Sequence, residues 1–431
     1  MYSRWFMTAL ATTSLGSAVA LAADSAPVAS GDWPGWRGPE RTGVSRETGL
    51  LRQWPPGGPK LLWKAKGLGG GYSTPSIAGG RLFVMGSRGD DEYVMALDLK
   101  DGRQLWSTRV GLVGENRGPN YPGPRSTPSI DGDLLYTIGS DGDLLCAETA
   151  TGKIVWQKHL ENDFKGNRNL WAYTESPLID GDTLVCTPGG ATATLVALDK
   201  KTGAVRWRTQ KEDYNISGYA SAIVAEVGGV KQYIQFLGAG LIGVSAKDGK
   251  ELWFYRGNLG GQSCATPIFH DGYVFSSAPG VEGAGGDALL RLTGDRAQVR
   301  AEQVYLVRTI LNHHGGVIRV GDYLYGTSGI ALLCMDFKTG AAKWRDRCVG
   351  KGSLVVADGH LYVRGEHGEI ALVEAIPEGY KEKGRFRQPD RSRFPAFCHP
   401  VVAGGRLYLR DEDVLLCYDV KEKSSTPPAK E

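Results

Sequence analysis

From about residue 61 onward the chain is a succession of short apolar runs separated by turns rich in glycine and aspartate. Runs such as Arg81-Leu82-Phe83-Val84 and Arg406-Leu407-Tyr408-Leu409 contain β-branched and aromatic residues, and turns such as Asp131-Gly132 and Gly404-Gly405 precede them. Apolar runs of this length between glycine turns are typical of β-hairpins. The pattern therefore predicts an all-β fold made of short antiparallel strands.

A longer motif, A-x-D-x-x-[TD]-G-x-x-x-W, recurs along the same region. Its five copies end at Trp106, Trp156, Trp207, Trp253 and Trp344. The glycines four residues earlier are Gly102, Gly152, Gly203, Gly249 and Gly340, and the small residues ten earlier are Ala96, Cys146, Ala197, Gly243 and Cys334. We interpret each copy as a strand that ends in a small inward residue, a tight turn with glycine at positive φ, and a return strand whose Trp packs between sheets.

A second recurring segment, related to Ser-Thr-Pro, precedes each hairpin and occurs eight times, from Ser73-Thr74-Pro75 to Cys398-His399-Pro400. We call each of its three aligned positions a column, and the third position the Pro column. Each unit then comprises four strands, except that the last unit stops at Val420 without its fourth strand. Leu61-Leu62-Trp63-Lys64 has the sequence of a fourth strand with no first three, so it should complete the eighth unit. The 360 residues from Leu61 to Val420 divide into eight units of 45. The repeat predicts an eight-bladed β-propeller closed by its N-terminal strand, which removes exposed sheet edges.

Two units depart from the motif and leave a seven-bladed ring as the alternative. In one the Trp is replaced near Val304-Tyr305, and in the other the turn is longer and Phe386 is expected to stand for the Trp.

The N-terminus reads as an export signal. Arg4 precedes an apolar run from Trp5 to Leu21, and Ala20-Leu21-Ala22 forms a cleavage site. A membrane anchor is the alternative, but the run is short and contains several Thr and Ser residues. We expect a signal peptide over 1–22, an irregular arm over 23–60, the propeller over 61–420 and a disordered tail over 421–431. The mature protein is expected to be a periplasmic or extracellular soluble monomer without a membrane span.

Composition excludes several classes of protein. The 50 Lys and Arg residues nearly balance the 47 Asp and Glu, which argues against a nucleic-acid binder. No CxxC or CxxCH occurs, so a zinc ribbon, a thioredoxin motif and a covalent c-type haem are excluded. Cys146, Cys334 and Cys417 share one position of the repeat and are predicted to be small core residues, with one disulfide elsewhere left open.

The repeat resembles that of the pyrroloquinoline-quinone (PQQ) β-propeller superfamily over about Leu61 to Val420. This superfamily includes quinoprotein dehydrogenases and also the non-enzymatic lipoprotein of the outer-membrane β-barrel assembly machinery, so the resemblance implies a fold rather than a function. The segment from Trp33 to Pro39 is similar to the opening of many exported PQQ-like propellers, and we interpret it as part of the arm.

The resemblance also allows a test for catalysis. The soluble PQQ dehydrogenases hold the quinone between a Trp and a disulfide of adjacent cysteines, beside a Ca²⁺ bound by carboxylate and amide groups. This chain has no adjacent cysteines. Its Asp-Gly-Asp segments, such as Asp131-Gly132-Asp133, are predicted to be hairpin turns, and no metal site is predicted. No catalytic residue is assigned, and PQQ with calcium is expected only under the dehydrogenase alternative.

A ligand site is expected where the first strand of each blade begins, on the face crossed by the loops between the fourth strand of one blade and the first strand of the next. The candidates there form a cationic and aromatic funnel suited to a planar or anionic ligand: Tyr72, Arg125, Trp171, Tyr173, Glu175, Tyr219, His313, His314, Lys351 and His399. Packing between blades is the alternative role for each. The leading hypothesis is a binding or scaffolding module for an envelope protein or a small molecule; a PQQ-dependent dehydrogenase and a carbohydrate-binding or lyase propeller are the alternatives.

Overall fold

The computed structural model describes residues 29, 31–116, 121–213, 216–257, 262–280, 284–295 and 298–423. The expected signal peptide lies outside these residues, as do residues 424–431 of the expected tail. Within the described part of the chain, no helix has the length and apolar character needed to cross a membrane.

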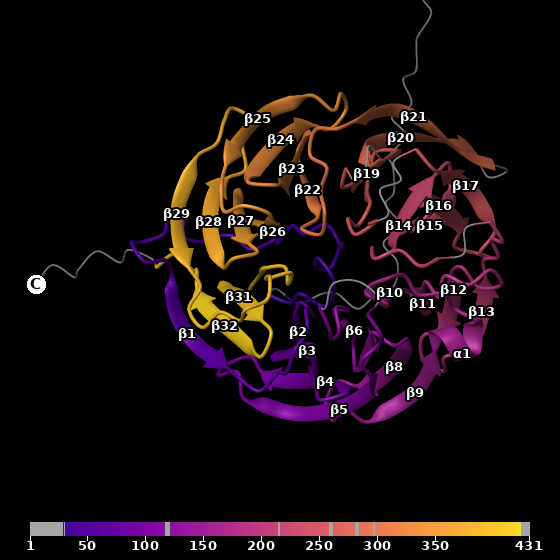
Figure 1. Ribbon diagram of the computed structural model, residues 1–431, viewed down its shortest axis with the longest axis horizontal. Helices are drawn as coiled ribbons and strands as arrows, with labels where there is room; N and C mark the ends of the chain where they lie inside the picture. The colour runs from indigo at the N-terminus through magenta and orange to yellow at the C-terminus, as the bar shows by residue number, and fades with distance from the viewer. Residues whose placement is uncertain are drawn as a thin grey trace, which may run out of the picture.

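Eight sheets form a closed ring, and each contains four antiparallel strands (Figure 1). Every blade meanders outward from the channel, so its first strand is innermost. The first four blades are β2 (Ser76–Ala78), β3 (Arg81–Arg88), β4 (Asp91–Asp98) and β5 (Gln104–Leu112); β6 (Ser129–Asp131), β7 (Leu134–Ile138), β8 (Asp143–Glu148) and β9 (Ile154–His159); β10 (Leu178–Asp180), β11 (Thr183–Cys186), β12 (Val196–Asp199) and β13 (Val205–Arg208); and β14 (Ile223–Val227), β15 (Val230–Leu237), β16 (Gly240–Ser245) and β17 (Glu251–Tyr255).

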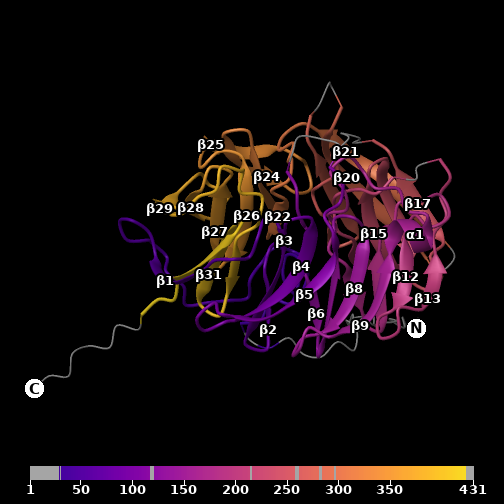
Figure 2. The same cartoon turned by 60° about the horizontal axis from the view of Figure 1, so that its bottom comes forward.

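The other four blades complete the ring, which Figure 2 shows from a second direction. They are β18 (Ile268–His270), β19 (Tyr273–Ala278), β20 (Gly286–Asp295) and β21 (Gln298–Val307); β22 (Val317–Val320), β23 (Tyr323–Ser328), β24 (Ala331–Asp336) and β25 (Ala342–Arg347); β26 (Gly352–Ala357), β27 (His360–Gly365), β28 (Glu369–Glu374) and β29 (Glu382–Arg387); and β30 (Val401–Ala403), β31 (Arg406–Asp411) and β32 (Val414–Asp419) with β1 (Lys60–Ala65). One short helix, α1 (Leu160–Phe164), follows β9.

The N-terminal strand closes the ring as the repeat predicted. β1 pairs antiparallel with β32, and Trp63 lies opposite Cys417. The eight-bladed prediction is therefore confirmed, and the seven-bladed alternative is wrong. Closure satisfies the edge that β32 would otherwise expose.

The motif's Trp and Gly meet between neighbouring blades. A Cβ atom added to the turn glycine would come within 2.3 to 2.9 Å of the indole of the preceding blade, and φ at these glycines is between 71° and 75°; the pairs are Trp63 with Gly102, Trp106 with Gly152, Trp156 with Gly203, and Trp207 with Gly249. The indole N–H of Trp106, for example, donates to the carbonyl of Thr149 in the next blade at 3.0 Å. Glycine is thus required for two reasons: the turn needs a positive φ, and the indole of the preceding blade leaves no room for a Cβ atom.

The fifth blade keeps this arrangement without a Trp. Tyr305 pairs with Leu289 at the Trp position, its hydroxyl donates to the carbonyl of Phe337 at 2.9 Å, and its ring covers Gly340. The prediction that the replacement lies near Val304-Tyr305 is confirmed. Trp253 differs from the other blade tryptophans, because its indole N–H bonds to Gln232 of its own blade.

The seventh blade corrects an expectation. In the other blades, the third-strand residue that pairs with the Trp directly precedes a β-bulge. In the seventh blade the residue before the bulge is Leu372, and it pairs with Gly384. The prediction that Phe386 takes the position of the Trp is therefore wrong. Trp54 of the N-terminal arm occupies the space over Gly384. A Cβ atom added to Gly384 would lie 2.6 Å from the Cβ atom of Trp54. Its ring lies 5.8 Å from Tyr362, close to the 6.0 Å between Trp63 and Tyr408 in the eighth blade. The arm therefore supplies the missing tryptophan.

Before it reaches Trp54, the arm crosses the ring beneath the channel. It makes isolated bridges with three blades, Trp33 with Ile77, Val44 with Val356 and Leu50 with Lys421. Between these bridges, Arg37 donates to the carbonyl of Val317 at 2.5 Å. Arg41 donates to the carbonyl of Ser176, just before the third blade, at 2.8 Å. Because the third blade lies opposite the seventh, these contacts hold the arm across the central axis.

All seven cysteines are free. Cys146, Cys334 and Cys417 are fully buried opposite the Trp of their own blades, which confirms their prediction as small core residues.

Candidate functional site

The beginnings of the eight first strands converge on one cavity of about 350 Å³. The residue three positions before the Pro column lines this cavity in every blade: Tyr72, Arg125, Thr174, Tyr219, Cys264, His313, Lys351 and Phe397. Trp171, His314 and His399 line it as well. Eight of the ten candidates from the sequence are therefore brought together on the expected face.

Hydrogen bonds between adjacent blades hold the first strands in place around the channel. The amide of Thr127 donates to the hydroxyl of Ser176, and the amide of Ser176 donates to the hydroxyl of Ser221, both at 2.9 Å. The same contact joins the amide of His399 to Thr74 at 3.1 Å across the junction of the last and first blades. Because these bonds are buried, the cavity wall belongs to the rigid scaffold.

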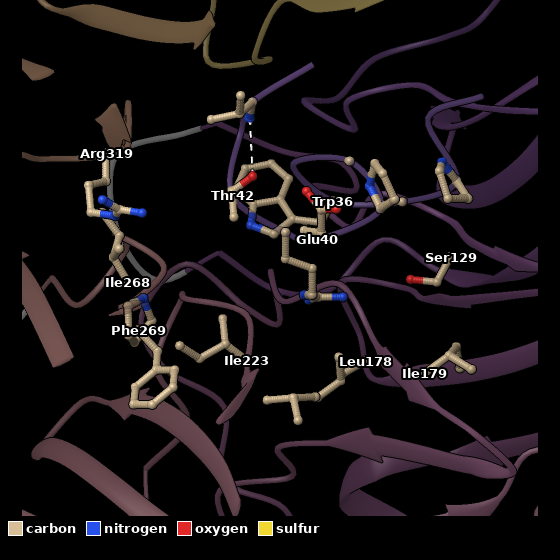
Figure 3. Close-up of a pocket in the computed structure, with 18 of the residues that line it drawn as sticks. Trp36, Glu40, Thr42, Ser129, Leu178, Ile179, Ile223, Ile268, Phe269 and Arg319 are labelled. Atoms are coloured by element: carbon tan, nitrogen blue, oxygen red, sulfur yellow. Dashed lines mark hydrogen bonds between the residues drawn. The ribbon is translucent and has the colours of Figure 1, made fainter. Parts of the chain in front are cut away.

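Trp36 of the arm forms the floor of the cavity. Its indole N–H donates to Thr266 Oγ1 at 2.8 Å, and its ring lies 4.6 Å from the ring of His399. Trp36 also lines a second cavity, of about 660 Å³, at the other end of the channel, where the side chains of Ile223, Ile268 and Phe269 gather (Figure 3). The arm thus separates two cavities, and only the first lies on the predicted face.

Arg125 is the main cation of the wall. Its guanidinium donates to the backbone carbonyls of Tyr121 (2.5 Å), Trp171 (3.3 Å) and Gly123 (3.4 Å), and it lies over the ring of Tyr72 at 5.4 Å. Burial lowers the pKa of Arg125. An arginine remains charged under these conditions, so the guanidinium is a fixed positive group in an aromatic setting.

Lys351, Glu366 and His314 form a chain of contacts across the cavity. Glu366 Oε1 accepts from His314 Nε2 at 2.5 Å and from Lys351 Nζ at 3.1 Å. Burial favours the protonated form of Glu366, but these two contacts outweigh burial and lower the pKa of Glu366 to about 2. Burial lowers the pKa of His314 despite Glu366. Lys351 therefore balances the charge of Glu366, while His314 donates from a neutral ring.

The other two histidines are also neutral. Burial, with help from His314 and Lys351, lowers the pKa of His313 to about 3. Burial and the nearby Arg37 lower the pKa of His399 to about 3. The cavity thus contains neutral imidazoles at neutral pH, and its fixed charges are those of Arg125, Lys351 and Glu366.

Trp171, which had no place in the repeat, belongs to the wall. Its ring packs edge-on against Tyr219 at 5.7 Å, and its carbonyl receives the Arg125 guanidinium. It is partly exposed, as expected of a residue that faces a cavity.

Tyr173 and Glu175 lie outside the cavity lining. The hydroxyl of Tyr173 donates to the carbonyl of Pro188 at 2.9 Å, and the residue is 1% exposed. Glu175 accepts from the amide and hydroxyl of Thr187, twelve residues later, as Ser126 accepts from the amide of Ile138 twelve residues later. Glu175 therefore takes the structural role of the column serine, and burial raises its pKa to about 7.

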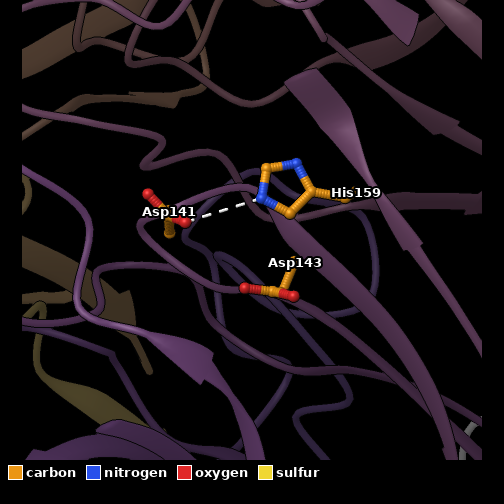
Figure 4. Close-up of side chains that lie close together, drawn as sticks. All are labelled: Asp141, Asp143 and His159. Carbon is orange, nitrogen blue, oxygen red and sulfur yellow. Dashed lines mark ion pairs between the residues drawn. The ribbon is translucent and has the colours of Figure 1, made fainter. Parts of the chain in front are cut away.

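Among the residues that the structure describes, one cluster elsewhere has the residue types of a metal site. Asp141, Asp143 and His159 lie close together near α1 (Figure 4). However, His159 Nδ1 accepts two amide N–H groups of α1, so the proton of the neutral ring is on Nε2, 3.5 Å from Asp141. Arg168 binds the other oxygen of Asp141 at 2.5 Å. The donors are already engaged by protein groups, and we assign no metal to them.

Several lining residues were missed by the sequence. Trp36 was assigned to the arm because it has no position in the repeat, and Tyr121, Gln262 and Glu366 lie in loops outside the columns. A signal for Trp36 was available in principle, since its segment is rich in Trp, Gly and Pro without belonging to a blade.

Comparison with known families identifies the chain's relatives. A model for a family of PQQ-like repeats, described as "Outer membrane protein assembly factor BamB", matches residues 39–117 and 90–345. The chain belongs to this family. The resemblance inferred from the repeat is thereby confirmed.

Individual relatives in this superfamily differ in function. The chain is 26% identical over 201 residues to "Outer membrane protein assembly factor BamB" of Burkholderia pseudomallei, covering 44% of each protein. It is also 26% identical over 276 residues to "Quinoprotein alcohol dehydrogenase PedH" of Pseudomonas putida, covering 57% of this chain and 42% of that enzyme. The matches span less than half the length of either relative.

Solved structures support the fold. BamB from Moraxella catarrhalis superimposes with a TM-score of 0.57 at 15% identity, covering 81% of this chain and 95% of that one. Quinohemoprotein alcohol dehydrogenase from Comamonas testosteroni gives 0.58 at 13% identity, covering 93% and 82%. At these identities the likeness concerns the propeller alone.

Proposed function

We propose that this chain is an exported binding propeller that holds a small molecule in the cavity above Trp36. The observation that carries the proposal is the convergence of all eight first-strand beginnings on one cavity with an aromatic floor. A concave site that is largely preformed and lined by aromatic groups with a few polar ones is the usual form of a small-molecule site. A protein partner at the same face, as suggested by the family's description, is the competing function.

Native mass spectrometry of the protein purified from its own cells tests this function. We expect a bound small molecule that is released on denaturation, and its loss in Trp36→Ala. Phe269→Ala, which truncates an aromatic residue of the other cavity, is the matched control and should retain the molecule. Co-purification of a protein that is indifferent to Trp36→Ala, with no small molecule retained, would support the competing function instead.

A calcium-bound quinone does not fit the residues of this cavity. Ca²⁺ requires six to eight oxygen ligands, largely carboxylates and carbonyls. Among the described residues of the lining, Glu366 is the single carboxylate and Gln262 the single side-chain amide, and Glu366 already binds Lys351 and His314. Arg125 and Lys351 would also repel a cation. We therefore expect no oxidation of alcohols in a dye-linked assay with added PQQ and CaCl₂, and clear turnover would contradict this conclusion.

Export forms part of the same proposal. The segment 1–22 has the sequence pattern of a cleaved signal, and cleavage after Ala22 would give a mature chain beginning at Ala23. Fractionation followed by N-terminal sequencing checks this, and a cytoplasmic, uncleaved chain would contradict it.

A further inference from the structure

We infer that the cavity above Trp36 receives a flat ring that carries a carboxylate, and that it binds this ligand without a divalent cation. The inference rests on the proposed small-molecule function and specifies the chemistry of the ligand. It is carried by the charges and rings of the lining.

Arg125 is a cation without a counter-ion among the residues that the structure describes. The hydrogen bonds of its guanidinium go to three backbone carbonyls, and no carboxylate within the described residues lies at ion-pair distance from it. Glu92 influences it electrostatically, but both oxygens of Glu92 bind Ser140, and burial raises the pKa of Glu92 to about 7. Charged groups inside proteins are nearly always paired, so a carboxylate of the ligand is the missing partner.

Lys351 offers a second positive group. One of its ammonium hydrogens is directed to Glu366, and the described part of the chain leaves the other two for a ligand. Its side chain is 37% exposed, whereas that of Glu366 is 14% exposed, so the ammonium is the more accessible member of the pair. With Arg125 and Lys351 positive, Glu366 negative and the histidines neutral, the described residues of the lining have a net charge of one positive unit. A ligand with one carboxylate neutralises it.

The rest of the lining selects a flat ring. The partly exposed indole, phenol and phenyl groups of the described lining are those of Trp36, Trp171, Tyr121 and Phe397. Phe397 packs against Tyr72 at 5.1 Å and His314 at 4.5 Å, which fixes its orientation. A volume of about 350 Å³ is at the small end of ligand sites and accommodates two or three fused rings. Aromatic faces bind such rings by offset or edge contacts.

The experiment compares two probes of equal shape, naphthalene-2-carboxylate and the neutral 2-naphthalenemethanol, by isothermal titration of the mature chain in EDTA and in CaCl₂. We expect the carboxylate to bind at least about ten-fold more tightly than the alcohol, with the same affinity in both buffers. Lys351→Gln should weaken binding of the carboxylate about ten-fold and leave the alcohol unchanged. Lys153→Gln, an exposed lysine on the turn between β8 and β9, is the matched control and should alter neither probe.

The outcomes separate this inference from the function on which it rests. Equal affinity for the two probes, a requirement for calcium, or an equal effect of Lys351→Gln on both probes overturns the inference and leaves small-molecule binding intact. If neither probe binds, the molecule found by native mass spectrometry decides: an aromatic carboxylate supports the inference, a neutral molecule overturns it, and the absence of any molecule overturns both.

Discussion

Replacement of Trp54 by alanine tests whether the N-terminal arm completes the seventh blade. Trp54 is 4% exposed and packs on Tyr362 and Phe386, at 5.8 and 5.2 Å between ring centroids. Truncation of a buried Trp to alanine costs about 3 to 5 kcal/mol, since the lost contacts leave a cavity. The indole N–H of Trp54 has no hydrogen-bond partner among the described residues, so no hydrogen bond is lost. We therefore expect the lower end of the range, about 3 kcal/mol.

Urea unfolding followed by far-ultraviolet circular dichroism measures this loss. Trp106→Ala is the positive control, because Trp106 closes its own blade, and Gln53→Ala is the negative control, because Gln53 is an exposed neighbour of Trp54. Trp54→Ala should resemble the first and not the second. A loss of unfolding free energy below about 1 kcal/mol would refute the conclusion that Trp54 replaces the missing tryptophan of the seventh blade.

Three further predictions concern stability. Burial raises the pKa values of Glu92 and Glu175 to about 7, so between pH 4.5 and 7 the folded state binds more protons than the unfolded state. The free energy of unfolding should therefore fall as pH rises through this window, and it should fall less in Glu92→Gln. A free energy of unfolding that rises with pH would contradict these raised pKa values. His159 accepts the first amides of α1, so His159→Ala should cost about 1 kcal/mol and His159→Asn should recover most of it, while ZnCl₂ leaves the melting temperature of the native chain unchanged. Dithiothreitol should also leave the melting temperature unchanged, because all seven cysteines are free; a marked decrease would reveal a disulfide.

The blades were predictable from the sequence because their interactions are local or repeat at a fixed interval. A turn glycine and a Trp four residues later specify a hairpin, and the same pair in the next unit specifies the contact between blades. Even the blade without a Trp was located, since Tyr305 lies in the expected place of the repeat. The positions that converge on the cavity followed from the same repeat, because ring symmetry brings equivalent residues to the channel.

The departures from these predictions occur where the contact is neither local nor periodic. Phe386 is an aromatic residue near the expected position of the Trp. However, the bulge after Leu372 sets the register of the strand pair, so Gly384 lies opposite Leu372 at the Trp position. Tyr173 and Glu175 adjoin cavity residues in the chain, yet neighbouring residues of an extended segment point in opposite directions. Trp36 was not selected, because the Trp, Gly and Pro of its segment mark a special region but do not indicate that the arm crosses the ring.

The sequence by itself determined the number of blades, the strand that closes them and the ring of residues around the channel. Each of these depends on hydrogen bonds and packing between units that are copies of one another. Only the tertiary structure decided the path of the arm, which places Trp36 beneath the cavity and Trp54 in the seventh blade. The physical reason is that the arm has no periodic pattern of its own, and it is positioned by single contacts with blades that are distant in the chain.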